Sequence, residues 1–275
     1  MAPRIDERGN PPSGLFGRDE ELRAVLTALA GRGCVVAGSA GVGKSRLASD
    51  AAATLGRSRT VVRVVATAAA ATIPFGSVSH LLPGGTAPTI ADFVAVLRGG
   101  DLGPSPTLFV DDAHLLDDAS AALLLAVANT GVAPLLLTVR SHEPAPDALV
   151  ALWKDRYLDR VDLQALSERE VEQMVDDLLG APSHALAYKW IYRVSQGNPL
   201  FVTEIIADVR RTGRLELREG RWHLDEGRRP LERLSELLAS HIGSVSAEAH
   251  AALEVLVLGT PMRLSVFEEL ASAGA

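Results

Sequence analysis

The segment GCVVAGSAGVGKSRLASDAA, residues 33–52, is the most informative part of the chain. A short apolar run typical of a buried strand is followed by a glycine-rich turn and then by a segment with the composition of a helix. Residues 38–45 match the pattern G-x-x-x-x-G-K-[ST]. Glycines at these positions let successive backbone N–H groups point inward at a polyphosphate, and the following helix adds free N–H donors and a positive dipole end. We therefore predict a nucleotide-binding loop here.

The residue types of this loop suggest individual roles. Lys44 is expected to reach the β- and γ-phosphates, and the Ser45 hydroxyl is expected to bind Mg²⁺. The other predicted nucleotide-binding residues of the loop are Gly38, Ser39, Ala40, Gly41, Val42, Gly43 and Arg46. The alternative is a glycine-rich turn that only joins a strand to a helix, but four specified positions make a chance match rare.

A second signal is the apolar run at residues 107–110, which ends in Asp111 and Asp112. Ligands bind at the carboxyl ends of strands in open α/β sheets. Asp111 is expected to hold Mg²⁺ through its water shell, and Asp112 to orient or deprotonate the attacking water. A solvated acidic loop is the alternative, since two more aspartates follow. His114 is either a residue at the start of a helix or a catalytic group.

A third signal is LLLTVRS, residues 135–141, where another apolar run ends in Thr138 and Arg140. A guanidinium at the carboxyl end of a central strand can sense a γ-phosphate through forked hydrogen bonds. An arginine in a surface loop is the alternative. The predicted catalytic residues are thus Lys44, Asp111, Asp112 and Arg140.

Short apolar runs alternate with helical patterns along the first 166 residues. The predicted strands cover residues 34–37, 60–67, 107–110 and, more weakly, 160–166, and a fourth apolar strand lies within residues 133–144 and ends in a polar loop. The valine-rich run at 60–67 is interpreted as a buried strand, and the alanine tract at 68–71 as either helix or loop. This alternation indicates an α/β fold with a mainly parallel sheet and helices on both faces.

The pattern becomes helical at Ser167, which forms a capping-box pattern with Glu170. Helices are expected to continue to about Arg211, and a short hairpin is predicted around Glu219 and Gly220. Further helices are predicted from residue 230 onward.

Composition limits the classes of function. The chain has 275 residues and a net charge of −7, which argues against binding a nucleic-acid backbone by this segment alone. Cys34 is the only cysteine, so no internal disulfide can form, and a buried apolar role is favoured over a reactive thiol. No apolar run is long enough to span a membrane, and the first residues lack a signal core. We expect a soluble, cytoplasmic protein without membrane contact.

In combination, the glycine-rich loop, the strand that ends in two aspartates and the strand that ends in Thr-x-Arg resemble the STAND branch of the AAA+-like P-loop ATPases. Gly197-Asn198-Pro199 strengthens this resemblance, because that branch carries a Gly-x-Pro motif in a helical lid, although an ordinary turn between helices is the alternative. The phrases VDDAHLLD and SQGNPLFVTEI look like the ATPase module of large LuxR-family transcriptional regulators. The resemblance covers residues 15–267.

The resemblance implies four parts of the chain. These are a flexible lead-in at 1–14, a P-loop core with a five-stranded sheet at 15–166, a helical lid at 167–214, and a hairpin with the start of a truncated winged-helix-like region at 215–275. It also implies that ATP or ADP binds with Mg²⁺ and that Pro199 lies against the adenine. Within the similar segment LFGRDEELRAVLTAL, Phe16 and Gly17 would form the near wall of the base pocket, next to Arg18.

The function implied is a nucleotide-operated signalling switch with slow ATPase activity, since Asp112 stands where fast AAA+ enzymes have a glutamate. ATP binding would close the lid and promote self-association. DNA would be bound through a C-terminal helix-turn-helix outside these residues. Two alternatives are a P-loop enzyme such as a small-molecule kinase, and a scaffold that binds ADP permanently without hydrolysis.

Overall fold

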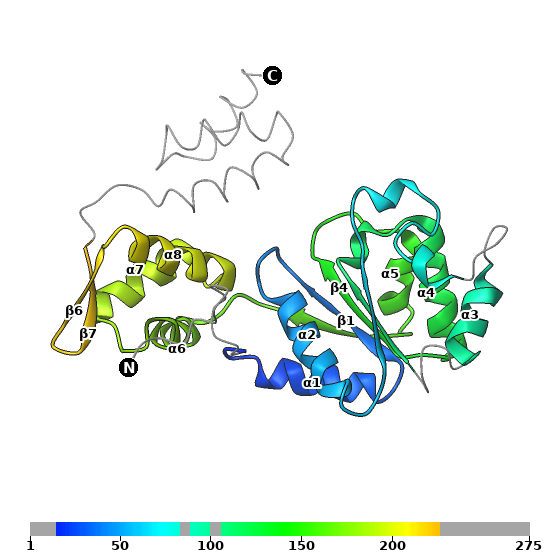
Figure 1. The fold of residues 1–275 in the computed structure, drawn as a ribbon, viewed down its shortest axis with the longest axis horizontal. Helices are drawn as coiled ribbons and strands as arrows, with labels where there is room; N and C mark the ends of the chain where they lie inside the picture. The colour runs from blue at the N-terminus through cyan, green and yellow to red at the C-terminus, as the bar shows by residue number, and fades with distance from the viewer. Residues whose placement is uncertain (1–14, 83–88, 100–105, 226–275) are drawn as a thin grey trace, which may run out of the picture.

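The computed structural model describes residues 15–82, 89–99 and 106–225, and its centre is a five-stranded sheet (Figure 1). Neighbouring strands are all parallel, in the order β2-β3-β4-β1-β5. The strands are β1 (Gly33–Gly38), β2 (Val61–Val65), β3 (Thr107–Asp111), β4 (Leu135–Arg140) and β5 (Asp159–Leu163). The predicted α/β fold with a mainly parallel sheet is confirmed.

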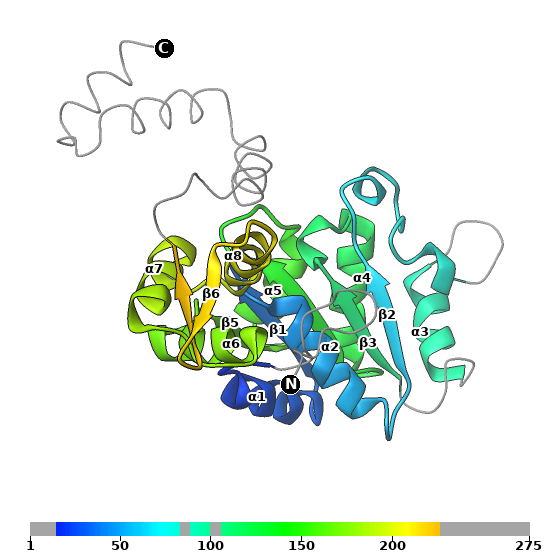
Figure 2. The same ribbon diagram turned by 60° about the vertical axis from the view of Figure 1, so that its left-hand side comes forward.

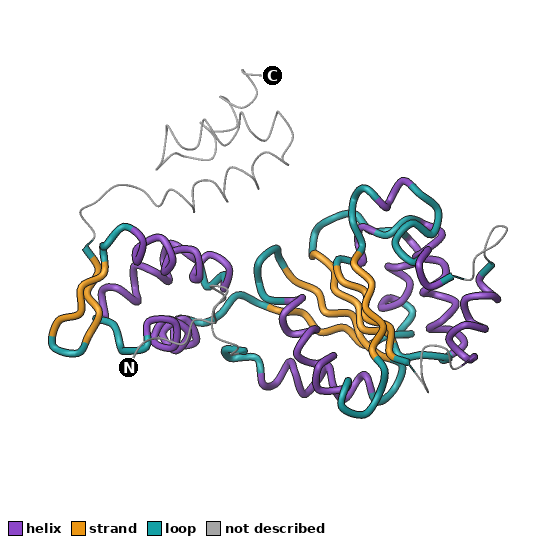
Figure 3. The backbone as a smooth tube through the Cα atoms, viewed as in Figure 1, coloured by secondary structure: helices purple, strands orange, loops and turns teal. Residues whose placement is uncertain are grey.

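Two helical layers cover the sheet because the side chains of each inner strand alternate between its faces. In β1, Cys34 and Val36 pack against α1 (Asp19–Leu29) and α2 (Lys44–Leu55). Val35 and Ala37 join the core on the opposite face. That face is covered by α3 (Ile90–Gly99), α4 (Asp118–Thr130) and α5 (Asp147–Lys154). Figure 3 shows the strands between these layers, which explains why β1, β3 and β4 are buried along almost their whole length.

The prediction of a buried strand at residues 60–67 is wrong in one respect, because β2 is an edge strand. Of its five residues only Val64 is buried, and Val65 is 53% exposed. The strand order leaves β2 with one neighbour, β3. Valine favours strands in general, so a valine-rich run identifies a strand without showing whether both of its faces are covered.

Several local features differ from the sequence-based expectation or resolve it. The alanine tract begins as a turn, and its second half belongs to a short 3₁₀ helix, η1 (Ala70–Thr72); a second one, η2 (Ser79–Leu81), follows. Helix α5 was not predicted, and β5 ends three residues earlier than expected. The predicted lead-in and the helices after residue 230 lie outside the described residues. In the described part of the chain, no helix is both long and apolar enough to cross a membrane.

Beyond the sheet lie three helices and a hairpin, which we call the three-helix unit (Figure 2). It comprises α6 (Glu168–Leu179), α7 (Ala185–Ser195), α8 (Pro199–Arg211), β6 (Leu215–Arg218) and β7 (Arg221–Leu224). The predicted capping box of Ser167 and Glu170 is present at the start of α6. The hairpin is present too, and Trp222 joins the apolar cluster of the helices while its Nε1 donates to the Leu179 carbonyl at 3.3 Å.

Candidate functional site

The glycine-rich loop connects the end of β1 to the start of α2, as predicted. Gly41 and Gly43 have φ angles of +74° and +102°, in the left-handed region that glycine adopts without strain. A Cβ atom at Gly41 would also lie 2.8 Å from Asn198 Oδ1 and 2.9 Å from Leu200 Cβ. Glycine is therefore required at position 41 for a second reason, because α8 packs directly against the loop.

Lys44 is the first residue of α2 and is only 6% exposed. Its Nζ donates a hydrogen bond to the Ser39 carbonyl oxygen at 2.8 Å. Burial lowers the pKa of Lys44, and the nearby Asp112 carboxylate partly opposes this effect. A compact cation is thus held inside the curve of the loop, where it can contact a polyphosphate.

Asp111 ends β3 and connects three elements through its carboxylate. Its Oδ1 accepts hydrogen bonds from the hydroxyls of Ser45 and Thr138, each at 2.7 Å. Its Oδ2 lies 3.0 Å from Arg63 Nη2. Thr138 Oγ1 also accepts the backbone N–H of Asp112 at 2.8 Å. The sequence indicated Thr138 only as part of a motif. In the structure its hydroxyl bonds to the side chain of Asp111 and to the backbone of Asp112, and so orients both aspartates.

Asp112 turns away from the strand with a φ of +52°, a conformation that aspartate tolerates better than most residues. It lines the same pocket as Arg140, the last residue of β4. Arg140 Nη1 donates to Glu143 Oε1 at 3.1 Å. Arg140 thus ends a strand and lines the pocket, and its partner Glu143 was not anticipated.

His114 is buried behind Arg140 and does not line the pocket. Its Nδ1 accepts the backbone N–H of Arg140 at 3.4 Å, and its Nε2 lies 3.2 Å from Glu143 Oε2. Burial lowers the pKa of His114, against the opposing effect of the Asp112 and Glu143 carboxylates. Its position in the short turn η3 (Ala113–Leu115) suits support of Arg140 and Glu143 better than contact with a ligand.

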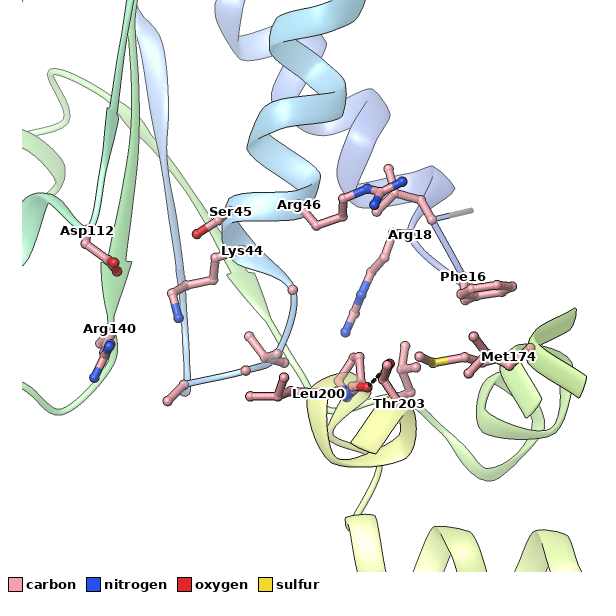
Figure 4. A pocket seen from close by; sticks show the side chains of 18 residues that line it. Phe16, Arg18, Lys44, Ser45, Arg46, Asp112, Arg140, Met174, Leu200 and Thr203 are labelled. Carbon is pink, nitrogen blue, oxygen red and sulfur yellow. Dashed lines mark hydrogen bonds between the residues drawn. The ribbon is translucent and has the colours of Figure 1, made fainter. Parts of the chain in front are cut away.

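These residues line a pocket of about 460 Å³ between the core and the three-helix unit (Figure 4). One end carries Lys44, Ser45, Asp112 and Arg140, whereas Phe16 and Met174 lie together at the other end. Sequence analysis did not identify six residues of the pocket wall: Leu15, Leu166, Met174, Leu178, Leu200 and Thr203. Five of the six are leucine or methionine and looked like ordinary core residues, and the packing of α6 and α8 brings Met174, Leu178, Leu200 and Thr203 to the pocket.

Most of the predicted binding residues meet at this pocket. The wall includes Phe16, Arg18, Ala40, Gly41, Val42, Gly43, Lys44, Ser45, Arg46, Asp112, Arg140 and Pro199. Gly38, Ser39 and Asp111 do not line this pocket, and Gly38 and Ser39 line a neighbouring cavity that also includes Arg140. Gly17 lies next to Glu170, outside the pocket wall. Arg18 is buried, with Nη1 2.8 Å from Glu21 Oε1 and Nη2 donating to the Gln164 carbonyl.

Helix α8 contacts the loop through its first turn. Asn198 caps this helix, and its Nδ2 donates to the Ala40 carbonyl at 2.9 Å. The backbone N–H of Leu200 donates to the Gly41 carbonyl at 3.3 Å. Behind the cap, Leu166 N–H donates to the Gly197 carbonyl at 2.8 Å. The Gly-Asn-Pro triplet is thus more than a turn between helices, because it joins the three-helix unit to the loop.

The donor set suits a magnesium ion. Within the described residues, no three or more His, Cys, Asp or Glu side chains cluster as a metal site. The Ser45 hydroxyl and the Asp111 carboxylate provide hard oxygen donors next to the loop, 2.7 Å apart. Mg²⁺ prefers few protein ligands and completes its shell with water and substrate phosphates, so this sparse set fits it.

Comparison with known proteins agrees with this geometry. Residues 14–93 match a family model described as an AAA ATPase domain. No curated protein matches the chain by sequence. Among solved structures, the Orc1 protein of Aeropyrum pernix, in complex with DNA, is 14% identical with a TM-score of 0.56, over 95% of this chain and 78% of that one.

Two further structures are similar. AMPPCP-bound DnaA of Aquifex aeolicus is 15% identical with a TM-score of 0.55, over 98% of this chain and 87% of that one. A Signal Transduction ATPase with Numerous Domains (STAND) from Pyrococcus horikoshii, with a tetratricopeptide repeat sensor, is 17% identical with a TM-score of 0.51, over 90% of this chain and 36% of that one. The chain therefore has the fold of the P-loop ATPases, and its residues 14–93 are similar to an AAA ATPase domain.

Proposed function

We propose that this chain binds ATP with Mg²⁺, hydrolyses it slowly, and uses the state of the nucleotide to move the three-helix unit as a lid. The observation that carries the proposal is the contact of α8 with the loop, where Asn198 and Leu200 bond to two loop carbonyls. A nucleotide with its phosphates in the loop would touch both parts of the molecule. A change in its phosphates would therefore act directly on the start of α8.

The polar end of the pocket supports phosphate binding. Lys44 and the loop N–H groups would bind the β- and γ-phosphates, and the γ-phosphate would compete with Glu143 for Arg140. Ser45, directly, and Asp111, through water, would hold Mg²⁺, which when bound neutralises charge on the phosphate oxygens. The apolar end, with Phe16, would receive the adenine against Pro199.

Asp112 is the proposed general base. It would accept a proton from the water that attacks the γ-phosphorus, while the bond to the β-phosphate oxygen breaks and ADP is left. An aspartate reaches this water less readily than a glutamate, which supports slow turnover and a switch in place of a motor.

The wider role is a module of a larger LuxR-family transcriptional regulator. Its support is the resemblance of VDDAHLLD and SQGNPLFVTEI to that family. The net charge of −7 supports DNA binding by another part of such a protein, through a helix-turn-helix, and ATP-dependent self-association would transmit the signal. The proposed location of the protein is the cytoplasm.

The experiment compares the nucleotide content and ATP turnover of the wild type with those of Asp112→Asn. Asparagine tolerates the positive φ of this position, so the backbone is kept. We expect turnover to fall about 100-fold with ATP affinity unchanged. The matched control is Asp118→Asn, in the same acidic segment but exposed, which should turn over ATP normally. Equal turnover in Asp112→Asn and the wild type would exclude Asp112 as the base.

The same measurements separate the alternatives. A small-molecule kinase would form ADP only when an acceptor is added. A permanent ADP scaffold would purify with ADP bound and show no turnover in any variant. The kinase alternative is less favoured, because the wall of the pocket opposite the loop is made by the three-helix unit and not by a separate acceptor site.

A further inference from the structure

Arg63 does not line the pocket, yet it contacts the aspartate expected to serve Mg²⁺. It lies in the middle of the edge strand β2 (Figure 2), opposite Phe109 of β3 in register. Its guanidinium carbon is 5.0 Å from the centre of the Phe109 ring, and its Nη2 is 3.0 Å from Asp111 Oδ2. None of the sequence motifs accounts for this arginine.

The two oxygens of Asp111 are occupied differently. Oδ1 accepts the hydroxyls of Ser45 and Thr138, which together use its two lone pairs. Oδ2 is therefore the atom left to accept a hydrogen bond from a water bound to Mg²⁺. In the structure this atom is paired with Arg63.

We propose that Arg63 sets the Mg²⁺ requirement of the site. Its guanidinium shares Oδ2 with the water that Mg²⁺ would bring, and its positive charge repels the ion. The site therefore needs a higher Mg²⁺ concentration than the same site without this charge. The effect is moderate because half of the Arg63 side chain is exposed and water screens the charge. Arg63 acts through Asp111 and is a positioning residue. The inference rests on the proposed nucleotide site.

The opposite edge of the sheet provides a matched control. Arg160 lies in β5, with its guanidinium carbon 5.6 Å from the centre of the Trp153 ring and both Asp162 oxygens within hydrogen-bond distance. Arg160 thus combines an aromatic ring and a carboxylate in the same way as Arg63. Its partner Asp162 is not among the predicted metal ligands, so loss of this arginine tests charge and strand stability alone.

The test is the binding of a fluorescent ADP analogue, mantADP, first with a chelator and then at stepped Mg²⁺ concentrations. We expect Arg63→Gln to lower the Mg²⁺ concentration at half-maximal effect about threefold to tenfold. Its affinity for mantADP with chelator should stay within about twofold of the wild type, as the arginine does not touch the pocket. Arg160→Gln should leave both quantities within the same range.

Two more variants separate charge from shape. Arg63→Met keeps an aliphatic stem over Phe109 and should behave like Arg63→Gln, and it replaces that variant if circular dichroism shows poor folding. Arg63→Lys keeps the charge and should stay close to the wild type. The inference is overturned if the Mg²⁺ concentration at half-maximal effect is unchanged or raised in the neutral variants. It is also overturned if this concentration falls as far in Arg63→Lys as in the neutral variants.

The outcomes distinguish this inference from the proposed function. If the wild type binds mantADP neither with the chelator nor at any Mg²⁺ concentration, the nucleotide site itself is wrong. If mantADP binds but Mg²⁺ has no effect on the wild type, the metal site and the role of Arg63 both fail. If Mg²⁺ acts equally on the wild type and the neutral variants, only the role of Arg63 fails.

Discussion

The two ends of the pocket are built in different ways. At the polar end, Asp112 and Arg140 lie at the carboxyl ends of β3 and β4, and Lys44 follows the loop that leaves β1. At the apolar end, Phe16 precedes α1, whereas Met174 comes from α6, more than 150 positions later in the sequence. Parallel strands bring their carboxyl ends to one edge without further help, but the apolar end exists only because the three-helix unit packs next to the core.

The difference indicates a division of work. The polar end would bind any polyphosphate, since its donors recognise charge and not a base. The apolar end would select the base and would sense the position of the three-helix unit. Variants at the two ends should therefore have separable effects on affinity and on base selectivity.

The largest effect is expected from Lys44→Ala. Loss of the buried ammonium should weaken ATP and inorganic triphosphate alike, by about 100-fold, because it removes a charge-assisted contact from every polyphosphate. Isothermal titration measures both affinities. Lys154→Ala, at the exposed end of α5, is the control and should bind both ligands normally. Micromolar ATP binding retained by Lys44→Ala would contradict the polar end as described.

A smaller and more selective effect is expected from Phe16→Ala. Loss of a ring against the adenine should weaken ATP about tenfold and leave inorganic triphosphate unchanged. Competition against mantADP gives both values. Phe201→Ala removes a ring that packs in the same apolar cluster without lining the pocket, and it should change neither affinity. An equal loss for both ligands in Phe16→Ala would show that the two ends are not independent.

The smallest effect concerns pH and the buried His114. Since burial lowers its pKa in the folded protein below the ordinary value of 6.5, the unfolded chain binds its proton first as pH falls. The contribution to the free energy of unfolding is thus complete above pH 6.5 and is lost as pH falls through the folded pKa. Urea unfolding on both sides of pH 6.5 should show this slope.

The slope should be smaller in His114→Gln than in the wild type. His80→Gln, at an exposed histidine, should keep the wild-type slope. The comparison uses the slope of the free energy of unfolding against pH and not its absolute value. Carboxylates such as Asp117, whose pKa is also lowered in the folded protein, contribute to this free energy at lower pH in all three proteins. Burial alone would raise the pKa of Asp117, but hydrogen bonds from Ser120 and Phe75 outweigh it. Identical slopes in the wild type and His114→Gln would show that folding does not lower the pKa of this histidine.

The polar end could be predicted from sequence because each of its parts is local. A strand, a turn and a helix within residues 33–52 are enough to form the loop. An apolar run that ends in two aspartates places these aspartates at the carboxyl end of a strand. The capping box of Ser167 and Glu170 was equally clear, since its two residues interact across one turn. Thr138 was visible as part of a motif, although its bonds to the two aspartates were not.

Features that depend on strand order or on distant packing could not be predicted. The valines at 60–67 look the same in a central strand and at an edge, and β2 proved to be at the edge. Arg63 is an unremarkable charge in the sequence, and its contact with Asp111 depends on how β2 aligns with β3. Met174 and Leu178 looked like core residues of a helix, and they are also the wall of a pocket.

The sequence by itself determined the phosphate-binding loop, the residues at the strand ends and the α/β class, because these follow from backbone geometry and side-chain chemistry over a few neighbouring residues. Only the tertiary structure decided which strand lies at the edge, which arginine faces Asp111, and which apolar side chains enclose the pocket. These depend on contacts between segments far apart in the chain, where many alternative pairings satisfy the same local pattern and the burial of the whole apolar surface selects one of them.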